Sequence, residues 1–450
     1  MTGKNIICAG AGKSGVQSAK LLLRNGSNVT IYDQNENLDK EKLLEQFGEA
    51  KPDIAIGELS DELLDKSDLL ILSPGIPCDA DFVKKAKEKI PVWGEIELAW
   101  YFNKGRVAAI TGTNGKTTTT SLVGEIFKNY NENTIVVGNI GTPFTTYADK
   151  TTEDTLVAAE ISSFQLETIH TFHPHVSAVL NLTPDHLNRH YTFDNYCNCK
   201  FRIQENATED DYIVLNYDDP ETRARKDLVK KANIVWFSRI DELEKGVFVK
   251  DGHIVVKWDD KEEIILDISD IKIPGDHNVE NVLAAAAVTY FMGVPKEVIK
   301  KTVASFMGVE HRIEYVKDVK GVAYYNDSKG TNPDAAIKAI KAMKTKTLLI
   351  GGGYDKKSTY DEWIEAFDGK VKYLVLIGVT APKIAECARR HGFNDIVFKD
   401  DLKAAVEFCY ENAEKGETVL LSPACASWDQ FKSYEQRGEL FKEYVKALKE

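Results

Sequence analysis

Short apolar runs alternate with helical patterns along most of the chain, and such runs predict buried β-strands. At the start, residues 5–9 are apolar, residues 10–15 are rich in glycine, and residues 16–24 have the apolar spacing of a helix. Further apolar runs at 29–33 and 69–72 predict the next strands of this region. Strands that alternate with helices in this way predict a parallel, doubly wound α/β unit.

The rest of the chain shows the same alternation of strand and helix patterns. The segment 234–273 is charged and rich in short strand patterns, and residues 282–288 predict an alanine-rich helix. Further strands are predicted at 107–110, 135–141, 155–160 and 176–182, and then at 322–325, 347–350, 373–378 and 418–421.

The length of 450 residues accommodates about three domains. We expect an α/β fold with an N-terminal Rossmann-like domain at 1–94, a central P-loop ATPase-like parallel sheet at 95–308, and a C-terminal Rossmann-like α/β domain at 309–450.

Composition narrows the class of protein. Hydrophobic residues make up 43% and charged residues 28% of the chain, as in soluble globular proteins. The net charge of −13 argues against a general binder of nucleic acid or of anionic membranes, which needs a basic face. No apolar run reaches the roughly 18 residues of a membrane span. The first residues enter a strand directly, so we expect no signal peptide and a cytoplasmic location. The seven cysteines, an odd number, do not predict a disulfide framework.

A glycine-rich stretch between a strand and a helix is the first candidate for chemistry. It runs from Gly112 to Thr117, directly after the apolar run 107–110. Its glycines let backbone N–H groups approach a phosphate, Lys116 would reach the terminal phosphates, and the Thr117 hydroxyl would bind Mg²⁺. The full Walker pattern fails because Ile110 stands where it requires glycine. The alternative is an ordinary turn between strand and helix.

A second glycine motif opens the chain. Gly10, Gly12 and Gly15 form a complete GxGxxG, and Asp33 follows Gly15 by 18 residues, near the spacing of a dinucleotide-binding motif. A glycine turn at a helix N-terminus also binds the diphosphate of a sugar nucleotide, which Lys13 would suit. The alternative is a motif kept only for close packing of helix on strand.

Several polar side chains follow predicted strands of the central sheet. Lys116, Asn139, Glu160 and His186 each come at or just after a strand, and ligands gather at the carboxyl ends of parallel strands. Glu160 and His186 are therefore candidate metal ligands. Glu160 could instead begin a helix, and His186 could simply be exposed.

Three further polar residues have both a functional and an ordinary interpretation. Lys200 lies beside two aromatic residues on a predicted helix, which favours burial, although its stem could also cover apolar surface with the amine in water. Asn278 and Asn281 share a face of a helix's first turn and could bind a base, or could be helix-capping asparagines.

Taken together, these motifs resemble the ATP-dependent Mur ligases, cytoplasmic enzymes that form amide bonds in peptidoglycan precursors. The resemblance covers essentially the whole chain, and the short loop form GTNGKT is typical of that family. It rests on TGTNGKT, GNIG, EISSFQLE, LTPDH, the helix of Lys200, GDHNVEN, the pair His311-Arg312, YNDSKGTNP and LSPACASWDQF.

SPACASWDQF, YEQRG and DSKGTNP most resemble the branch of the family that adds D-glutamate to UDP-N-acetylmuramoyl-L-alanine. The resemblance implies that the alanine carboxylate takes the γ-phosphate of ATP to form an acyl phosphate, which the D-glutamate amine attacks. ADP and phosphate are the other products, and the step serves cell-wall biogenesis, cell shape and cell division.

The resemblance also assigns residues. It implies that the N-terminal domain holds the UDP moiety and not NAD. UDP-substrate residues are then Lys13, Ser14, Asp33, Ser73, Pro74 and Gly75, with Asn139 and His186 at the muramoyl-alanine end. ATP residues are Gly112, Thr113, Asn114, Gly115, Lys116, Thr117, Thr118, Asn278, Asn281, Arg312 and Asp327. D-glutamate residues are Thr331, Lys356, Ser427, Trp428 and Tyr434, with Lys357 a rival to Lys356.

The catalytic residues implied by the resemblance are Lys116, Glu160, His186 and Lys200. Thr117, Glu160, His186 and Lys200, the last as a carbamate, would hold two Mg²⁺ ions. No base for the amine is assigned, and we expect a monomer that binds small molecules only. Alternatives are another amino-acid-adding Mur or folylpolyglutamate-type ligase, an NAD-dependent oxidoreductase, and a regulatory nucleotide-binding protein with a degenerate site.

Overall fold

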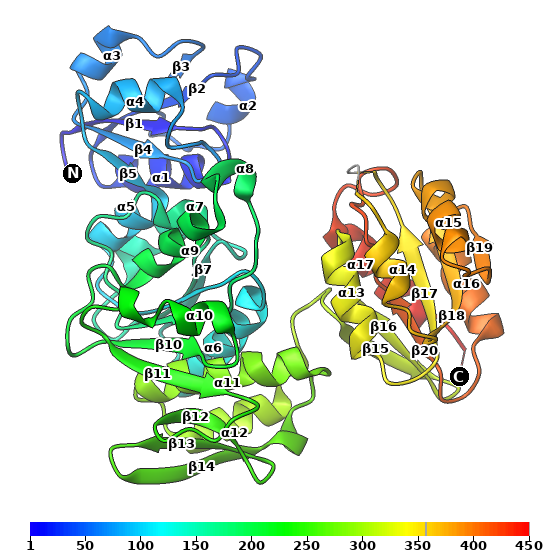
Figure 1. Ribbon diagram of the computed structural model, residues 1–450. Helices are drawn as coiled ribbons and strands as arrows, with labels where there is room; N and C mark the ends of the chain where they lie inside the picture. Colours follow the sequence, from blue (N-terminus) through cyan, green and yellow to red (C-terminus); the bar gives the residue numbers. More distant parts are fainter. Residues whose placement is uncertain (356–357, 450) are drawn as a thin grey trace. The chain divides into compact units, whose positions relative to one another are not determined.

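The computed structural model describes residues 1–355 and 358–449. The chain forms two compact units (Figure 1). The first combines residues Met1–Asp270 with Val279–Ala304, and the second combines Ile271–Asn278 with the chain from Ser305 onward. The mixed α/β class expected from the sequence is confirmed by three sheets, two in the first unit and one in the second.

The first sheet of unit 1 is five-stranded, with the order β3-β2-β1-β4-β5, and all of its pairs are parallel. The order reverses at β1, so the ends of β1 and β4 form the crevice where doubly wound sheets bind ligands. Its elements are β1 (Asn5–Ala9), α1 (Lys13–Arg24), β2 (Asn28–Asp33), α2 (Lys40–Leu44), β3 (Asp53–Ile56), α3 (Asp61–Asp65), β4 (Leu69–Leu72), α4 (Asp81–Lys87), β5 (Val92–Gly94) and α5 (Glu95–Phe102).

The second sheet of unit 1 has nine strands in the order β14-β13-β12-β11-β10-β9-β6-β8-β7. Its pairs are parallel from β7 to β12, and β13 and β14 extend it as antiparallel strands. The strands are β6 (Arg106–Thr111), β7 (Thr134–Gly138), β8 (Leu156–Glu160), β9 (Val176–Val179), β10 (Tyr212–Asn216), β11 (Asn233–Ser238), β12 (Gly246–Lys250), β13 (His253–Trp258) and β14 (Lys261–Asp267). The helices are α6 (Lys116–Tyr130), α7 (Ser163–Leu166), α8 (Leu187–His190), α9 (Phe193–Phe201), α10 (Pro220–Ala224), α11 (Asp276–Phe291) and α12 (Lys296–Ser305).

The sheet of unit 2 has six strands in the order β15-β16-β20-β17-β18-β19, parallel except for the pair β15–β16. Its elements are β15 (Glu314–Val319), β16 (Val322–Asn326), α13 (Pro333–Ala342), β17 (Thr347–Gly352), α14 (Asp361–Glu365), β18 (Val371–Ile377), α15 (Ala381–Arg390), β19 (Ile396–Phe398), α16 (Leu402–Asn412), β20 (Thr418–Leu421) and α17 (Tyr434–Lys446).

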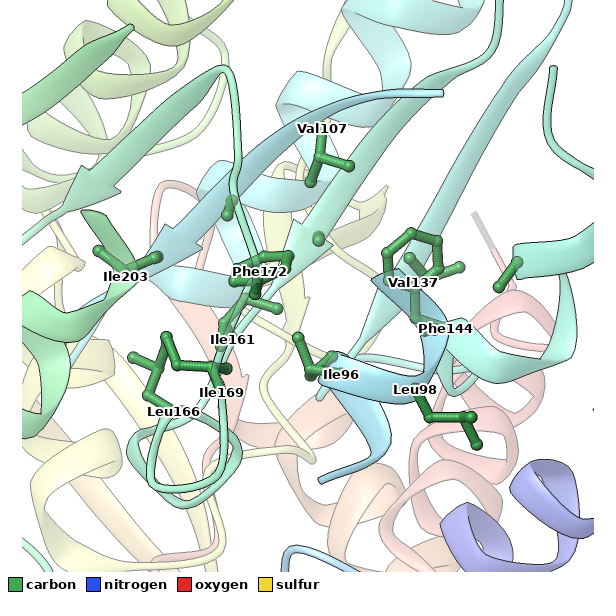
Figure 2. Close-up of a cluster of buried hydrophobic side chains, with 14 of the residues drawn as sticks. Ile96, Leu98, Val107, Val137, Phe144, Ile161, Leu166, Ile169, Phe172 and Ile203 are labelled. Carbon is green, nitrogen blue, oxygen red and sulfur yellow. The ribbon is translucent and has the colours of Figure 1, made fainter. Parts of the chain in front are cut away.

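One apolar core joins the two sheets of unit 1. Ile96 and Leu98 of α5 belong to the same buried cluster as Val107 of β6, Val137 of β7 and Phe172 (Figure 2). Phe172 is fully buried, and removing such a side chain from water contributes about 2–3 kcal/mol. Within unit 1 the cluster therefore packs elements of the first sheet against elements of the second.

Two further observations concern the cysteines and the helices. All seven cysteines are free thiols. Within the described part of the chain, no helix has both the length and the apolar character that crossing a membrane requires.

Candidate active site

The glycine stretch after β6 is a tight loop that ends at the N-terminus of α6. Gly112 has a φ of +148° and Gly115 a φ of +84°, a region of backbone conformation that favours glycine. A Cβ on Gly115 would lie 2.3 Å from Asn281 Oδ1, and one on Gly112 would lie 3.0 Å from Leu180 Cβ. The loop therefore needs glycine at both positions, as either a phosphate-binding loop or an ordinary tight turn would.

Two lysines converge on this loop. Lys116 Nζ donates to the carbonyl oxygens of Gly112, at 2.8 Å, and of Thr113, at 2.9 Å. Lys200 Nζ, from α9, also donates to Gly112 O at 2.8 Å. It lies 4.7 Å from the ring centroid of Tyr196. The predicted burial of Lys200 is confirmed, since its side chain is 2% exposed.

The position of Lys200 changes its protonation. Burial, followed by the charge of Lys116, lowers the pKa of Lys200 from 10.5 to about 7. An amine with such a pKa is largely neutral slightly above neutrality, and a neutral amine is a nucleophile. Lys200 is therefore poised for chemistry that an exposed lysine would not undergo at the same pH.

Glu160 and Asn139 lie at neighbouring strand ends, as the sequence predicted. Glu160 ends β8 and is 2% exposed, and its Oε1 accepts from Asn139 Nδ2 at 2.7 Å. Its Oε2 is buried and has no hydrogen-bond partner among the described residues. Gly138 makes this pairing possible, because a Cβ there would lie 2.2 Å from the Glu160 carbonyl oxygen. A buried carboxylate oxygen without a donor is a place where a cation would restore the lost solvation.

The strand order explains why these side chains share one edge. The strands β9, β6, β8 and β7 are consecutive neighbours in the sheet and are all parallel. Lys116, Glu160 and Asn139 follow three of them at their carboxyl ends. His186 follows β9 after a short segment, begins α8 with a φ of 53°, and is half exposed. Its ring centroid is 4.8 Å from that of Phe164 and its Nε2 is 3.5 Å from Asp185.

Two residues that the sequence did not single out hold the loop in place. Asn181 accepts from Asn114 N at 2.8 Å and donates Nδ2 to Asn114 O at 3.1 Å. The Tyr196 hydroxyl is 3.0 Å from Thr113 Oγ1, which also accepts from Thr183 N at 3.0 Å. In the sequence, only two features could have indicated these roles: Asn181 is a polar residue just after β9, and Tyr196 is an aromatic residue close to Lys200.

The threonines in the first turn of α6 differ in how far they are buried. Thr118 is buried, whereas Thr117 is half-buried. Asn281 lies behind the loop, where its Oδ1 accepts from Thr119 Oγ1 at 3.3 Å. Asn278, at the start of α11, donates Nδ2 to the carbonyl oxygen of Pro274 at 2.6 Å.

The glycine motif of the first sheet is closed by Asp33. The Asp33 carboxylate accepts from Ala11 N at 2.8 Å and from Asn35 N at 3.0 Å, so it supports its own loop from the end of β2. A Cβ on Gly15 would lie 1.8 Å from Gly10 O. The N-terminus of α1 therefore packs so closely against the turn after β1 that only glycine fits at this position. Packing and phosphate binding are compatible interpretations of the same glycines.

The turn after β4 lies beside this motif. Ser73 Oγ is buried without a hydrogen-bond partner among the described residues, and a Cβ on Gly10 would approach it to 2.7 Å. Ser14 is half-buried in the first turn of α1, and Gly75 is exposed. The Lys13 ammonium donates to the carbonyl oxygen of Gly141, in the turn that carries Asn139. The two sheets of unit 1 therefore bring the predicted UDP residues near the central sheet's polar edge.

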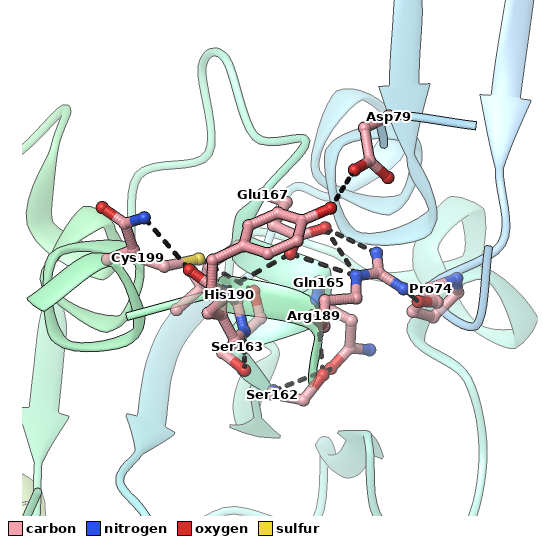
Figure 3. A network of polar contacts seen from close by, with 12 residues as sticks. Pro74, Asp79, Ser162, Ser163, Gln165, Glu167, Arg189, His190 and Cys199 are labelled. Carbon is pink, nitrogen blue, oxygen red and sulfur yellow. Dashed lines mark hydrogen bonds and ion pairs between the residues drawn. The ribbon is translucent and has the colours of Figure 1, made fainter. Parts of the chain in front are cut away.

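A buried network around Arg189 ties the Ser73–Gly75 turn to the central sheet (Figure 3). Arg189 donates Nη1 to Pro74 O at 3.0 Å and Nη2 to Ile76 O at 2.9 Å. It also forms an ion pair with Glu167 at 2.5 Å. Next to it, His190 Nε2 lies 3.0 Å from Ser163 Oγ. Arg189, which the sequence did not single out, positions both the turn and the segment of His186.

In unit 2, Asp327 and Arg312 form a charged centre. Asp327 directly follows β16, is 2% exposed, and accepts from Ser422 Oγ at 2.7 Å. Burial raises the pKa of Asp327 to about 6, against the opposing charge of Arg312. Arg312 Nε is buried without a hydrogen-bond partner among the described residues. Arg312 thus retains a donor for an anionic ligand.

The described residues predicted to bind D-glutamate lie on two loops of unit 2 and at the start of α17. Thr331 donates its N–H to Lys329 O at 2.9 Å, and Ser427 is 1% exposed. Trp428 is 62% exposed, with its ring 5.6 Å from that of Tyr354. Tyr434 begins α17, and burial raises its pKa to about 12. The choice between Lys356 and Lys357 falls outside the described residues.

Arg437 connects these two loops and was not assigned from the sequence. Its side chain is fully buried. It donates Nε to Ser328 Oγ at 2.9 Å and Nη2 to Ser328 O at 2.8 Å. Its Nη1 donates to the carbonyl oxygens of Cys425, at 3.2 Å, and Ala426, at 3.4 Å. The guanidinium therefore holds the segment after Asp327 against the segment before Ser427.

Three family models match the chain in succession. They are "Mur ligase MurD-like, N-terminal domain" over residues 4–94, "Mur ligase middle domain" over 110–289, and "Mur ligase, glutamate ligase domain" over 311–425.

Relatives with similar sequences and solved structures with a similar fold are also Mur ligases. The UDP-N-acetylmuramoylalanine–D-glutamate ligase of Lachnoclostridium phytofermentans is 54% identical, with 100% of this chain and 99% of the relative covered. The same-named ligase of Thermoanaerobacter sp. strain X514 is 50% identical, with 100% and 99% covered. Among structures, MurF of Acinetobacter baumannii has a TM-score of 0.62 at 16% identity, with 97% of this chain and 93% of that chain covered. The UDP-N-acetylmuramate-alanine ligase MurC of Thermotoga maritima has a TM-score of 0.59 at 18% identity, with 99% and 100% covered. At these identities the structures show the fold, and the full-length relatives show that the chain belongs to the Mur ligase family.

Proposed function

We propose that this protein is an ATP-dependent ligase that joins D-glutamate to UDP-N-acetylmuramoyl-L-alanine and releases ADP and phosphate. The observation that carries the substrate assignment is full-length identity of 54% and 50% to two ligases whose names state this reaction. The reaction is a step in peptidoglycan precursor synthesis. We further propose that the protein acts in the cytoplasm as a monomer, and that it thereby serves cell shape and division.

The chemistry requires activation of the alanine carboxylate. A carboxylate does not acylate an amine unaided at neutral pH, so it first takes the γ-phosphate of ATP and becomes an acyl phosphate. The D-glutamate amine then attacks the carbonyl carbon, and phosphate leaves from the tetrahedral intermediate. Phosphoryl transfer depends mainly on positioning and charge neutralisation. Lys116 would supply positive charge to phosphates bound at the loop from Gly112 to Thr117.

Lys200 is proposed to carry a carbamate. Its neutral amine would add to the carbon of CO₂ and release a proton, which converts a cation into a carboxylate. The buried position beside Gly112 O and the lowered pKa support this step. In its protonated form Lys200 has no lone pair and could not bind a metal ion, whereas the carbamate would offer carboxylate oxygens.

Thr117, Glu160, His186 and the carbamate of Lys200 are proposed to hold two Mg²⁺ ions. The buried, unpartnered Glu160 Oε2 fits this assignment, because Mg²⁺ prefers a few carboxylates together with phosphate oxygens and water. When bound, Mg²⁺ neutralises the charge of the phosphates during transfer. Asn139 orients Glu160 through the 2.7 Å hydrogen bond to Oε1.

The UDP moiety is proposed to bind at the first sheet. Lys13, Ser14, Asp33 and the Ser73–Gly75 turn surround the crevice at the ends of β1 and β4. Asn139 and His186 would face the muramoyl-alanine end of the same substrate. The connection of the Ser73–Gly75 turn to α8 through Arg189 supports a fixed distance between the two ends.

The remaining assignments concern ATP and D-glutamate. Asn278 and Asn281 are proposed at the adenine, and Arg312 and Asp327 at the nucleotide. Thr331, Ser427, Trp428 and Tyr434 are proposed at D-glutamate. We propose domains at 1–94, 95–308 and 309–450 for UDP-substrate, ATP and D-glutamate, respectively.

The test is phosphate release by the purified protein with ATP and Mg²⁺. We expect release only when UDP-N-acetylmuramoyl-L-alanine and D-glutamate are both present. Matched reactions replace D-glutamate with L-glutamate, L-alanine or L-lysine, and the variant Lys116→Ala reports any contaminating ATPase. Release that requires a different amino acid would reassign the protein within the Mur or folylpolyglutamate-type ligases, and NAD(H) binding without release would favour the oxidoreductase alternative.

A further inference from the structure

A cluster of metal-binding side chains lies in unit 2, on elements to which the proposed reaction gives no role. Asp361 is the first residue of α14, Cys387 lies in α15, and His391 directly follows α15 (Figure 1). A carboxylate oxygen, the thiol sulfur and an imidazole nitrogen of these residues all lie within 4.8 Å of one another. Cys387 and His391 are four residues apart, so His391, the C-cap residue of α15, comes about one turn after Cys387.

The separations are those of a site that needs only small side-chain rotations. Asp361 Oδ1 lies 2.9 Å from His391 Nε2. With Zn–S near 2.3 Å and Zn–N near 2.0 Å, ligand atoms of a tetrahedral site are about 3.3–3.6 Å apart. The observed range, from 2.9 Å to at most 4.8 Å, brackets that value. A cation placed between the three atoms would separate Asp361 from His391 and draw the sulfur inward.

The groups around His391 favour the binding of a cation by its imidazole. Glu365 Oε1, one turn along α14, lies 3.7 Å from His391 Nδ1. In this structure Nε2 donates its hydrogen to Asp361 Oδ1, and a bound cation would take the place of that hydrogen. With the cation at Nε2, the remaining hydrogen lies on Nδ1, which faces the Glu365 carboxylate, as is common for metal-bound histidines. His391 is the C-cap of α15, where the partial negative charge of the helix end favours a cation.

The backbone at the cluster is held by the core. Cys387 is 3% exposed and belongs to the same buried cluster as Trp363 and Ile364 of α14. The thiol therefore points from packed structure toward the two outer ligands. Arg390 Nη2 lies 3.3 Å from Asp361 Oδ1 and supplies positive charge there, and its side chain is 62% exposed and free to move into water.

We propose that Asp361, Cys387 and His391 bind one divalent cation of borderline softness, of which Zn²⁺ is the type, with water at the fourth position. Thiolate, imidazole and carboxylate together select such ions over Mg²⁺, which prefers oxygen ligands alone. Binding forms a metal–sulfur bond, and the thiol proton passes to water. The ion joins α14 to α15 across one face of the third sheet.

The experiment titrates Co²⁺ into the untagged, reduced full-length protein in excess Mg²⁺, which occupies oxygen-only sites. A thiolate–Co²⁺ bond gives an intense near-ultraviolet charge-transfer absorption. We expect this band to saturate at one equivalent and to disappear when one equivalent of Zn²⁺ is added. Cys387→Ser should abolish the band, and His391→Ala should weaken Co²⁺ binding at least tenfold.

Matched controls separate this site from other thiols and histidines. Cys78→Ser removes a half-buried thiol of unit 1, and His253→Ala removes a histidine that pairs with Asp267 at 2.7 Å without a thiol. Both variants should keep the band and the affinity. If Cys387→Ser does not fold, the double variant Asp361→Asn/His391→Ala decides by the same loss of binding. Absence of the band in the wild type, or its persistence in Cys387→Ser, overturns the proposal. Neither result depends on ligase activity.

Discussion

Lys116 and Lys200 donate to the same carbonyl oxygen, that of Gly112, and each nitrogen lies 2.8 Å from it. Lys116 comes from the loop itself and Lys200 from α9, 84 residues later. Burial of Lys200, and after it the positive charge of Lys116, lowers the pKa of Lys200 to about 7. Two lysines therefore meet at one loop carbonyl, and Lys200 is in part a neutral amine near pH 7.

This arrangement predicts that Lys200 reduces stability. Its pKa is about 7 in the folded protein and 10.5 as the reference, so between these values the unfolded chain binds more protons and stability rises with pH. Below about pH 7 Lys200 is protonated in both the folded and the unfolded protein, and burying its charge then lowers the free energy of unfolding by the full amount. Lys200→Met should therefore raise the free energy of unfolding by about 1–3 kcal/mol at pH 7, and by less at pH 10, while phosphate release is lost. Denaturation at both pH values measures the effect.

The exposed lysine variant Lys403→Met is the control for Lys200→Met, because it removes the same charge without changing a buried site. It should leave both stability and turnover close to those of the wild type. An unchanged or lower stability of Lys200→Met at pH 7 would contradict the charge argument. Wild-type turnover by that variant would contradict the carbamate.

A second prediction concerns the charge of Glu160. Glu160→Gln keeps an oxygen that can accept from Asn139 but removes the negative charge at the buried, unpartnered Oε2. We expect turnover to fall about 100-fold or more and the Mg²⁺ concentration for half-maximal rate to rise. A Mg²⁺ titration of phosphate release measures both. Glu125→Gln, exposed on α6, should change neither, and normal Mg²⁺ dependence in Glu160→Gln would remove Glu160 from the metal site.

A third prediction concerns Asn181, which holds the loop through two hydrogen bonds to the Asn114 backbone. Asn181→Ala should raise the KM for ATP about 30-fold, since each of the two lost bonds contributes about 1 kcal/mol, and should change the KM for the UDP substrate little. Steady-state kinetics with each substrate varied give the comparison. Asn131→Ala, at the opposite end of α6, is the matched control. Equal effects on both KM values would indicate general damage to the fold.

The sequence pattern predicted those parts of the candidate site whose residues are close together in the chain or follow neighbouring parallel strands. The strand, loop and helix around Lys116 are contiguous, and Glu160 meets Asn139 because parallel neighbours end at one edge of a sheet. Other contacts depend on packing between distant segments: Asn181 is 67 residues from Asn114, and Arg437 is 109 from Ser328. No spacing rule connects such pairs. The same holds for Arg189, which reaches Pro74 across 115 residues.

The last prediction concerns Arg437, whose guanidinium joins Ser328 to the carbonyl oxygens of Cys425 and Ala426. A lysine cannot reproduce this planar set of donors, and one acceptor or more would stay buried and unpaired. Arg437→Lys should therefore lower the free energy of unfolding by about 2–4 kcal/mol and raise the KM for D-glutamate more than that for the UDP substrate, because the two loops it joins are in unit 2. Thermal denaturation and kinetics test both effects, with the exposed Arg389→Lys as the control. If Arg437→Lys lowers stability but leaves the KM for D-glutamate unchanged, Arg437 stabilises the fold and has no role in binding D-glutamate.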